Sequence, residues 1–283
     1  MAMTINTNIA SLNAQRNTAA NSANLSTTMA RLSSGLRVNS AKDDAAGLAI
    51  ADRMNTQVRG MNVAIRNAGD GISMAQVAEG GLSGINDMLQ RMRELAVQAS
   101  NSTNQSSDIA KLDKEYQELG KEVTRMIDAT QFNGESILKA TADYSFQIGA
   151  NTDLANQIVI SATTLDVSTG DLTGIVNGGT NSALDTAAAS SNTAAIDALD
   201  KALTVVNDAR ANLGAVQSRF ENTIAYLRTA VENQSAARGR IMDADFAAET
   251  ANLSRTQILQ QAGTAMIAQA NQLPQSVLKL LQG

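Results

Sequence analysis

The sequence lacks several residue types on which enzymes and metal sites depend. Its 283 residues include no cysteine, no histidine and no tryptophan, a single proline, and only 2% aromatic residues. Without histidine and cysteine, the chain has neither the commonest general base nor the commonest metal ligands, and it has no thiol nucleophile. No other group of residues is typical of a catalytic site, so we expect no enzyme activity, no cofactor and no metal.

Charge and hydropathy exclude two further classes of protein. The net charge is −5, so we expect no nucleic-acid partner. No apolar run approaches the ~20 residues that a membrane-spanning helix needs, so we expect no membrane partner either. Residues 1–13 lack a basic segment followed by an apolar one, and we therefore expect no cleaved secretory signal.

Helical periodicity dominates the first half of the chain. Apolar residues recur at steps of three and four over 54–96, which predicts about 50 helical residues, roughly 75 Å in length. Ser40 and Asp43 form a capping-box pattern, so we expect this helix to begin at Ser40. Five glycines within 69–84 indicate a bend or the close approach of another segment. A second helix with the same period is predicted over 109–127.

The second half returns to helix after an irregular region. Residues 144–148 and 157–161 predict a small β-hairpin, and Asn133-Gly134 is a tight-turn signal. Residues 163–193 are rich in Ser, Thr, Gly and Ala without any period, so we expect an exposed segment that tolerates change. Five large apolar residues then lie seven apart, as is typical of helix-on-helix packing: Leu199, Val206, Leu213, Phe220 and Leu227.

The two ends of the chain carry only narrow apolar stripes. Ordering each residue costs ~1–2 kcal/mol, and such narrow stripes do not recover that cost in a lone chain. We therefore expect both ends to be ordered mainly in an assembly of copies of the chain. The residues of this terminal stripe, which we interpret as a polymerisation surface, are Ile5, Ile9, Leu12, Leu25, Met29, Leu32, Leu36, Leu259, Met266, Leu273 and Leu280.

Charge supports pairing of the two ends. The N-terminal segment contains arginines and no acid, whereas Asp243, Asp245 and Glu249 open the last helical segment. Antiparallel pairing would place these acids near Arg31 and Arg37. Exposed ion pairs are worth only ~0.2–1 kcal/mol each, so we expect them to set the register of the two helices more than their stability.

These patterns together predict a mainly α protein. Long antiparallel helices would form coiled-coil rods, with a small β-hairpin region and a short irregular insert. Such a chain would be a structural subunit that assembles with copies of itself through its two ends.

Several longer motifs connect the chain to one family. They lie at 5–8 (INTN), 32–48 (LSSGLRVNSAKDDAAGL), 90–98 (QRMRELAVQ), 130–134 (TQFNG), 238–241 (RGRI), 243–249 (DADFAAE), 257–263 (QILQQAG) and 268–272 (AQANQ). In these runs the sequence resembles the bacterial flagellins, and the resemblance covers residues 1–140 and 195–283.

The resemblance implies a division of the chain and a function. Expected are an N-terminal filament-core helix at 1–40, disordered in the monomer, and the N-terminal part of a rod domain at 41–140. A short β-ribbon with a variable exposed insert follows at 141–194, then a C-terminal rod helix at 195–240. A C-terminal filament-core helix, also disordered in the monomer, closes the chain at 241–283. The expected function is that of a subunit that polymerises into the helical flagellar filament for motility.

The resemblance also implies partners. It implies export without signal cleavage through the flagellar type III export apparatus, to the extracellular flagellum. An export chaperone is expected at the C-terminal helix, and filament cap and hook-associated proteins are expected in the assembled flagellum. The host Toll-like receptor 5 is expected to read the rod surface. The residues that match its contacts in the family are Gln90, Arg91, Leu95, Gln98 and Glu115.

Three other readings stay open at this point. A hook–filament junction protein shares the terminal plan, although the motif around Arg91 and the ending at 277–281 favour the filament protein. An enzyme displayed on the scaffold, as in flagellins with metalloprotease inserts, fits poorly with a short insert and no histidine. A cytoplasmic coiled-coil adaptor would not explain the shared motifs. On pattern alone, Arg91 and Glu94 could also belong to a solvated helix face.

Overall fold

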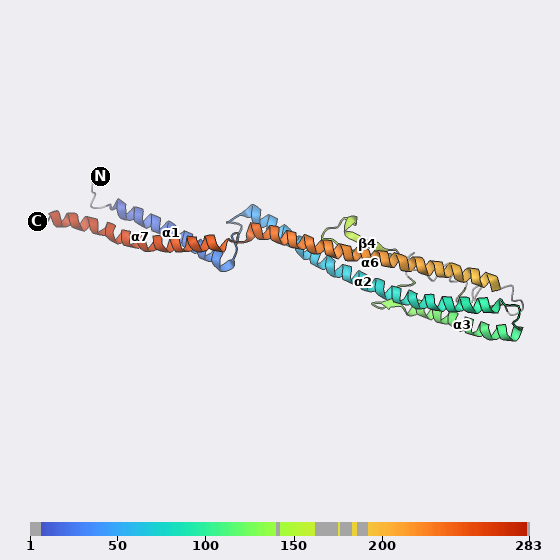
Figure 1. The fold of residues 1–283 in the computed structure, drawn as a ribbon. Coiled ribbons are helices and arrows are strands. Elements are labelled where there is room, and N and C mark those ends of the chain that lie inside the picture. The colour runs from blue at the N-terminus through green and yellow to red at the C-terminus, as the bar shows by residue number, and fades with distance from the viewer. Residues whose placement is uncertain (1–6, 140–141, 162–174, 176–182, 186–191, 282–283) are drawn as a thin grey trace. The chain divides into compact units, whose positions relative to one another are not determined.

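The computed structural model describes residues 7–139, 142–161, 175, 183–185 and 192–281 (Figure 1). These residues form five α-helices, two β-hairpins and one 3-10 turn, so the predicted mainly α fold is confirmed. The helices are α1 (Ile9–Ser34), α2 (Ala45–Ala99), α3 (Ser106–Ala129), α6 (Thr193–Met242) and α7 (Phe246–Leu281). The hairpins join β1 (Gln131–Phe132) to β2 (Glu135–Ser136) and β3 (Tyr144–Gln147) to β4 (Gln157–Ile160), with the 3-10 turn η1 at Leu154–Asn156.

The chain divides into two compact units. A terminal unit comprises residues 1–57 and 232–283, and a central unit comprises residues 58–231. Helices α1 and α7 belong to the terminal unit, and α3 and both hairpins belong to the central unit. Helices α2 and α6 contribute residues to each unit.

The start of α2 differs from the prediction. The helix begins at Ala45, five residues after Ser40. The backbone N–H and the hydroxyl of Ser40 both donate to Oδ2 of Asp43, at 3.0 Å each. These bonds close a turn and lower the pKa of the Asp43 carboxyl. Asp44 caps the helix instead, because its Oδ1 accepts the N–H of Gly47 at 2.8 Å.

Helices α2, α3 and α6 build the core of the central unit, where they lie side by side (Figure 1). Each contributes buried residues spaced seven apart, and full burial of one large apolar side chain stabilises by ~1.5–3 kcal/mol. The row predicted on α6 is confirmed, with every member at 4% exposure or less. The matching rows are Ala68, Ala75, Leu82, Leu89 and Ala96 on α2, and Ile109, Tyr116 and Val123 on α3.

Glycines on α2 allow other segments to approach this helix closely, as the sequence indicates. A Cβ atom on Gly71 would lie 2.6 Å from Cζ of Phe220, and one on Gly84 would lie 2.6 Å from Cε of Met126. Gly81 faces Thr130 at the same distance. The interpretation does not hold for the other two glycines of the set, since nothing lies within 4 Å of a Cβ built on Gly69 or Gly80.

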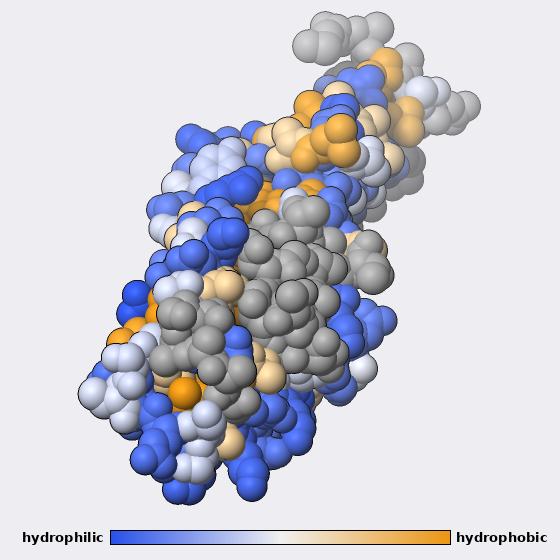
Figure 2. All heavy atoms as spheres, turned by 90° about the vertical axis from the view of Figure 1, so that its right-hand side faces the viewer, coloured by the Kyte–Doolittle hydropathy of each residue, from blue (hydrophilic) through white to orange (hydrophobic). Residues whose placement is uncertain are grey.

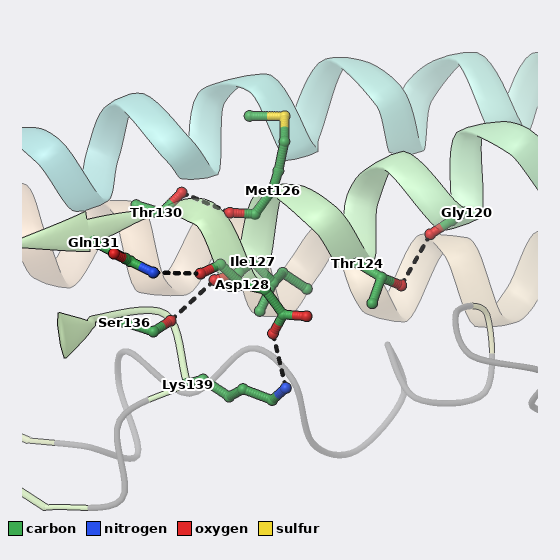
Figure 3. A network of polar contacts seen from close by, with 9 residues as sticks. All are labelled: Gly120, Thr124, Met126, Ile127, Asp128, Thr130, Gln131, Ser136 and Lys139. Atoms are coloured by element: carbon green, nitrogen blue, oxygen red, sulfur yellow. Dashed lines mark hydrogen bonds and ion pairs between the residues drawn. The ribbon is translucent and has the colours of Figure 1, made fainter. Parts of the chain in front are cut away.

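The end of α3 is tied to the first hairpin by a polar network (Figure 3). The N–H and hydroxyl of Thr130 both donate to the carbonyl four residues earlier, at 3.0 and 2.7 Å. The hydroxyl of Ser136 donates to the carbonyl of Ile127 at 3.2 Å, and Lys139 pairs with Asp128 at 2.8 Å. Helix ends leave carbonyls without helical partners, and here the hairpin supplies donors to them.

Both hairpins form where the sequence predicts turns and alternation. Asn133 and Gly134 have φ angles of 53° and 84°, the left-handed conformation that the tight turn between β1 and β2 requires. Strands β3 and β4 pair antiparallel, with Tyr144 opposite Ile160. Phe146 of β3 contacts Phe220 edge to face, at 5.5 Å between ring centroids, so the second hairpin packs against α6.

The predicted exposed insert contributes to the core. Ile175 is 1% exposed and Leu184 is 3% exposed, and both belong to the cluster built by the helices. The N–H of Leu184 also donates to Oδ1 of Asp113 on α3, at 2.7 Å. The expectation of an exposed segment is therefore wrong at these positions. Most other residues of 163–193 lie outside the described residues.

The outer surface is polar at one end of the central unit. The end that faces the viewer in Figure 2 is mainly hydrophilic among its coloured residues, with hydrophobic residues in small separate groups. Of the described helices, none combines the length and the hydropathy that crossing a bilayer demands.

Candidate functional site

Helices α1 and α7 form an antiparallel pair (Figure 1) held by polar contacts. The side-chain amide of Asn8 donates to the carbonyl of Ala270 at 2.8 Å. At the middle of α1, the amide of Asn21 donates to the carbonyl of Thr256 at the same distance. A hydroxyl–amide contact between Ser11 and Asn271 lies between helices as well. Side chains thus hydrogen-bond to the opposite helix along the first half of α1.

The buried positions of this pair hold small and polar residues. The buried residues among those described on the two helices are Ser11, Thr28, Glu249 and Ala270. A Cβ atom built on Gly263 would lie 3.6 Å from Cβ of Thr18, so the helix backbones approach closely at this level. A pair that buries no large apolar side chain gains little from the hydrophobic effect.

The large apolar residues of the pair face outward instead. Ile9 and Met266 are 69% and 62% exposed, and Leu12, Met29 and Leu259 are also exposed. Leu25, Leu32 and Leu36 are half-buried, so the terminal stripe is exposed in part. Ile5 lies outside the described residues, as do the side chains of Leu273 and Leu280. Phe246 and Ile258, each 65% exposed, extend the outer apolar surface and were missed because they fall outside the seven-residue spacing.

The junction between α1 and α2 is joined to the junction between α6 and α7. Gly35 ends α1 in the left-handed conformation, with φ of 72°, and its carbonyl accepts the N–H of Ala244 at 2.9 Å. Leu36 forms an isolated antiparallel bridge with Asp243, which we term the junction bridge. The guanidinium of Arg37 donates to the carbonyl of Ile241 at 2.8 Å.

The predicted approach of acids and arginines is only partly seen. The junction bridge brings Asp243 to the segment that carries Arg37, but Arg37 bonds a carbonyl rather than a carboxylate. Asp245 instead caps α7, because its Oδ1 accepts the N–H groups of the second and third residues after it, at 2.9 and 3.2 Å. Among these described side chains, no ion pair joins Arg31 or Arg37 to the acids.

A second group of candidate residues lies on the central unit around Arg91. Its Nε and Nη2 donate to Oε1 of Glu115 on α3, at 3.0 and 2.9 Å, and its Nη1 donates to Oε2 of Glu94 at 2.9 Å. These hydrogen bonds raise the pKa of Arg91, and the bond to Glu94 has the larger effect. The guanidinium therefore links α2 to α3 at the surface, as an exposed group with its donors directed along the helix face.

One predicted receptor residue is not on this surface. Leu95 is 0% exposed and belongs to the core of the central unit, because α2 turns this position toward the interior. Gln90 and Gln98 are exposed and line a shallow groove on α2. The other lining residues of this groove are Arg93, Glu94 and Val97.

Arg93, which sequence reasoning did not single out, connects α2 to α6. Its Nε and Nη2 donate to the two oxygens of Asp200, at 2.6 and 3.2 Å. This bidentate bond lowers the pKa of Asp200 and raises that of Arg93. The partner lies 107 residues away, so no local pattern could have identified it.

Comparison with known families decides the identity of this helical subunit. Residues 5–143 match the bacterial flagellin N-terminal helical region, and residues 196–281 match the bacterial flagellin C-terminal helical region. The chain belongs to the bacterial flagellins. A flagellin is a structural protein, and this flagellin is a structural subunit of the flagellar filament.

Full-length relatives agree with the family match. A flagellin of Halalkalibacterium halodurans is 46% identical over 288 residues, which cover 99% of this flagellin and 100% of the relative. The flagellar filament 33 kDa core protein of Treponema phagedenis is 40% identical over 291 residues, with 99% and 100% covered. A crystal structure of Bacillus cereus flagellin is 29% identical and covers 61% of this chain and 94% of that one, with a TM-score of 0.48.

Proposed function

We propose that this flagellin polymerises through the α1–α7 pair, and that neighbouring copies cover the outer apolar surface of the pair. The observation that carries the proposal is the inverted arrangement of side chains. Ser11 and Thr28 are buried between the helices, whereas Ile9 and Met266 are more than 60% exposed. Covering such side chains on assembly stabilises by ~25 cal/mol per Å² of apolar surface removed from water.

The same arrangement supports order that depends on assembly. The pair buries no large apolar side chain among its described residues, and ordering each residue costs ~1–2 kcal/mol. In the monomer we therefore propose that 1–40 and 241–283 are largely disordered, as the flagellin resemblance implies. Contacts with neighbouring copies then compensate for the loss of chain entropy.

A charge on the outer apolar surface tests this proposal. Met266→Asp would place a carboxylate where a neighbouring copy is expected, and burying an unpaired charge is strongly unfavourable. We expect strongly reduced filament formation, with unchanged melting of the central unit. Electron microscopy and sedimentation would measure assembly, and circular dichroism would measure melting.

Thr264→Asp provides the control for this experiment. Thr264 is exposed on the same helix, about 200° around the axis from Met266 at 3.6 residues per turn. Thr264→Asp introduces the same charge on a different face of α7 from Ile258, Leu259 and Met266, so assembly should persist. Normal filaments from Met266→Asp would show that the terminal stripe is not an assembly surface.

Export and location follow from the flagellin assignment as further proposals. We propose that the flagellar type III apparatus exports the chain to an extracellular filament, where cap and hook-associated proteins adjoin it. An export chaperone would cover the C-terminal helix before assembly. The exposed Ile258, Leu259 and Met266 support this, because an apolar surface of this kind promotes association with any apolar partner before export.

We also propose that the monomer is read by the host Toll-like receptor 5 at the surface around Arg91. Arg91 and Glu115 lie together on adjacent helices, and Gln90 and Gln98 flank them on α2. Leu95, being buried, would act only by holding α2 in place. A guanidinium can fork several hydrogen bonds, and arginine is enriched among the residues that dominate interfaces.

Loss of the Arg91 side chain tests receptor recognition. If Arg91 is an interface anchor, Arg91→Ala should weaken receptor binding by about 2 kcal/mol or more, and receptor signalling should fall with it. The matched control is Arg125→Ala, since Arg125 is exposed on α3 and pairs with Glu122 of its own helix. A reporter-cell assay in which folded Arg91→Ala monomer signals like the wild type would refute the assignment.

A further inference from the structure

Glu249 is the one charged residue that is buried in the part of the chain that the structure describes. It is 9% exposed and lies in the first turn of α7. The positive end of the helix favours a carboxylate there, and the low exposure of the residue limits its contact with water. Buried charges persist in proteins mainly where another charge or hydrogen bond compensates them. Among the described residues, none of the ion pairs includes Glu249.

The register of the helix pair places Arg31 at the level of Glu249. Thr18 lies against Gly263, and thirteen residues further along α1 is Arg31, opposite residue 250 of the antiparallel helix. Counting from the junction bridge, at the other end, places Arg31 opposite residue 248. Glu249 lies between these two positions.

Arg31 itself carries an unused donor. Its Nε is buried and has no hydrogen-bond partner, which is costly for a charged group. Arg31 also contributes to the lowered pKa of the Asp43 carboxyl, but Oδ2 of Asp43 already accepts two bonds from Ser40 and one from the N–H of Asn39. An unpaired buried donor thus lies at the level of Glu249, a residue of low exposure.

We propose that Arg31 and Glu249 form an ion pair when α1 and α7 pack in the filament, and that this pair fixes their axial register. The inference rests on the proposed function, because it concerns the α1–α7 pair in its assembled state. Closure of a neighbouring copy over the pair would remove remaining water, which strengthens the attraction between the two charges.

The rest of the interface explains why such a device is needed. Its buried positions hold small and polar residues, and Leu25 and Leu32 are only half-buried, so large side chains do little to fix one helix against the other. A slip of one or two turns would exchange one small residue for another along much of the pair. The same slip would leave Glu249 buried without its cation, and a single buried polar or charged contact is the best-attested means of specifying register in paired helices.

Exchange of the two charges tests the proposal in the full chain. The variants are Arg31→Glu, Glu249→Arg and the combination of both, with Arg16→Glu as control because Arg16 is exposed on α1. The measured quantity is the critical concentration for growth from filament seeds. Each single variant should raise it at least about tenfold, whereas the combination should return it to within about threefold of wild type. Arg16→Glu should leave it close to wild type.

Two results would overturn the proposal. One is a wild-type critical concentration for both single variants, which would mean that neither charge matters for packing. The other is a combined variant no better than the poorer single variant, because the two residues would then act independently. All variants are compared under conditions in which wild-type chains add to filament seeds. If the wild-type chain did not assemble at all, the proposed function itself would be overturned.

Discussion

At the scale of single residues, the two units differ in what they bury. In the central unit, Leu213 and Phe220 are 0% exposed and belong to one core with rows of the same spacing on α2 and α3. In the terminal unit, Ser11 and Thr28 take the interior and Met266 faces outward. The apolar spacing of seven residues occurs in both. It indicates that a helix face is to be covered, but not whether the same chain or another copy covers it.

Gly71 shows how one missing side chain shapes the central unit. Phe220 occupies the space that a Cβ would fill, and its ring then contacts Phe146 of β3. Gly71→Ala should destabilise the central unit by about 1–3 kcal/mol, because the ring or the helix must shift. Chemical denaturation of the monomer, followed by circular dichroism, would measure this.

The control for that substitution is two residues away on the same helix. Gly69→Ala meets nothing within 4 Å and should stabilise by roughly 0.5–1 kcal/mol, since alanine favours helix over glycine. Equal effects of the two substitutions would show that helix propensity, and not contact with Phe220, governs position 71.

At the scale of elements, the segment between β4 and α6 is more than a connection. Ile175 and Leu184 bury their side chains in the core, and Leu184 also donates a backbone hydrogen bond to α3. Shortening this segment across these two residues is therefore expected to destabilise the central unit. The sequence alone suggests the opposite, a segment that can be deleted freely.

Removing the side chain of Leu184 beyond its Cβ distinguishes the two expectations. Leu184→Ala should cost about 2–5 kcal/mol of unfolding free energy, the range for removing a buried leucine side chain. Leu154→Ala is the matched control, because Leu154 is 85% exposed in η1 and the same atoms are removed. A neutral Leu184→Ala would show that the segment does not pack in solution as described. Denaturant unfolding of both monomers gives the comparison.

At the scale of the whole molecule, the two units should differ in stability. The central unit combines three helices with two hairpins around one core, whereas the terminal unit has a narrow interior. Limited proteolysis of monomer should therefore remove about 40–50 residues from each end and stop at the central unit, since proteases cut regions that open at low free-energy cost.

Filaments provide the comparison for this prediction. The same protease should leave both ends intact in polymer, because binding to neighbouring copies stabilises whatever it orders. Mass spectrometry of the fragments would locate the cuts relative to 1–57 and 232–283, the residues of the terminal unit. Equal resistance of monomer and filament would refute order that depends on assembly.

Features with a short repeat or a fixed local geometry were predictable from the sequence. The helices followed from steps of three and four, and the α6 row at Leu199 to Leu227 followed from its spacing of seven. Asn133 and Gly134 identified a turn because few other residues adopt positive φ. The start of α2 was wrong because Asp43 and Asp44 both offer caps, and only the folded turn at Ser40 decides between them.

Features that depend on distant partners required the tertiary structure. The motifs determined the family, and Arg91 and Glu115 were placed together correctly, but the direction of Leu95 depends on the rotation of α2 against α3 and α6. The burial of Leu184 was equally invisible, because a single apolar residue in an irregular segment has no period. A sequence determines which local conformations are favourable through interactions between near neighbours. Which face of each helix becomes buried depends on residues far apart in the sequence, so only the tertiary structure determines it. Glu249, a charged residue that is 9% exposed, is an example.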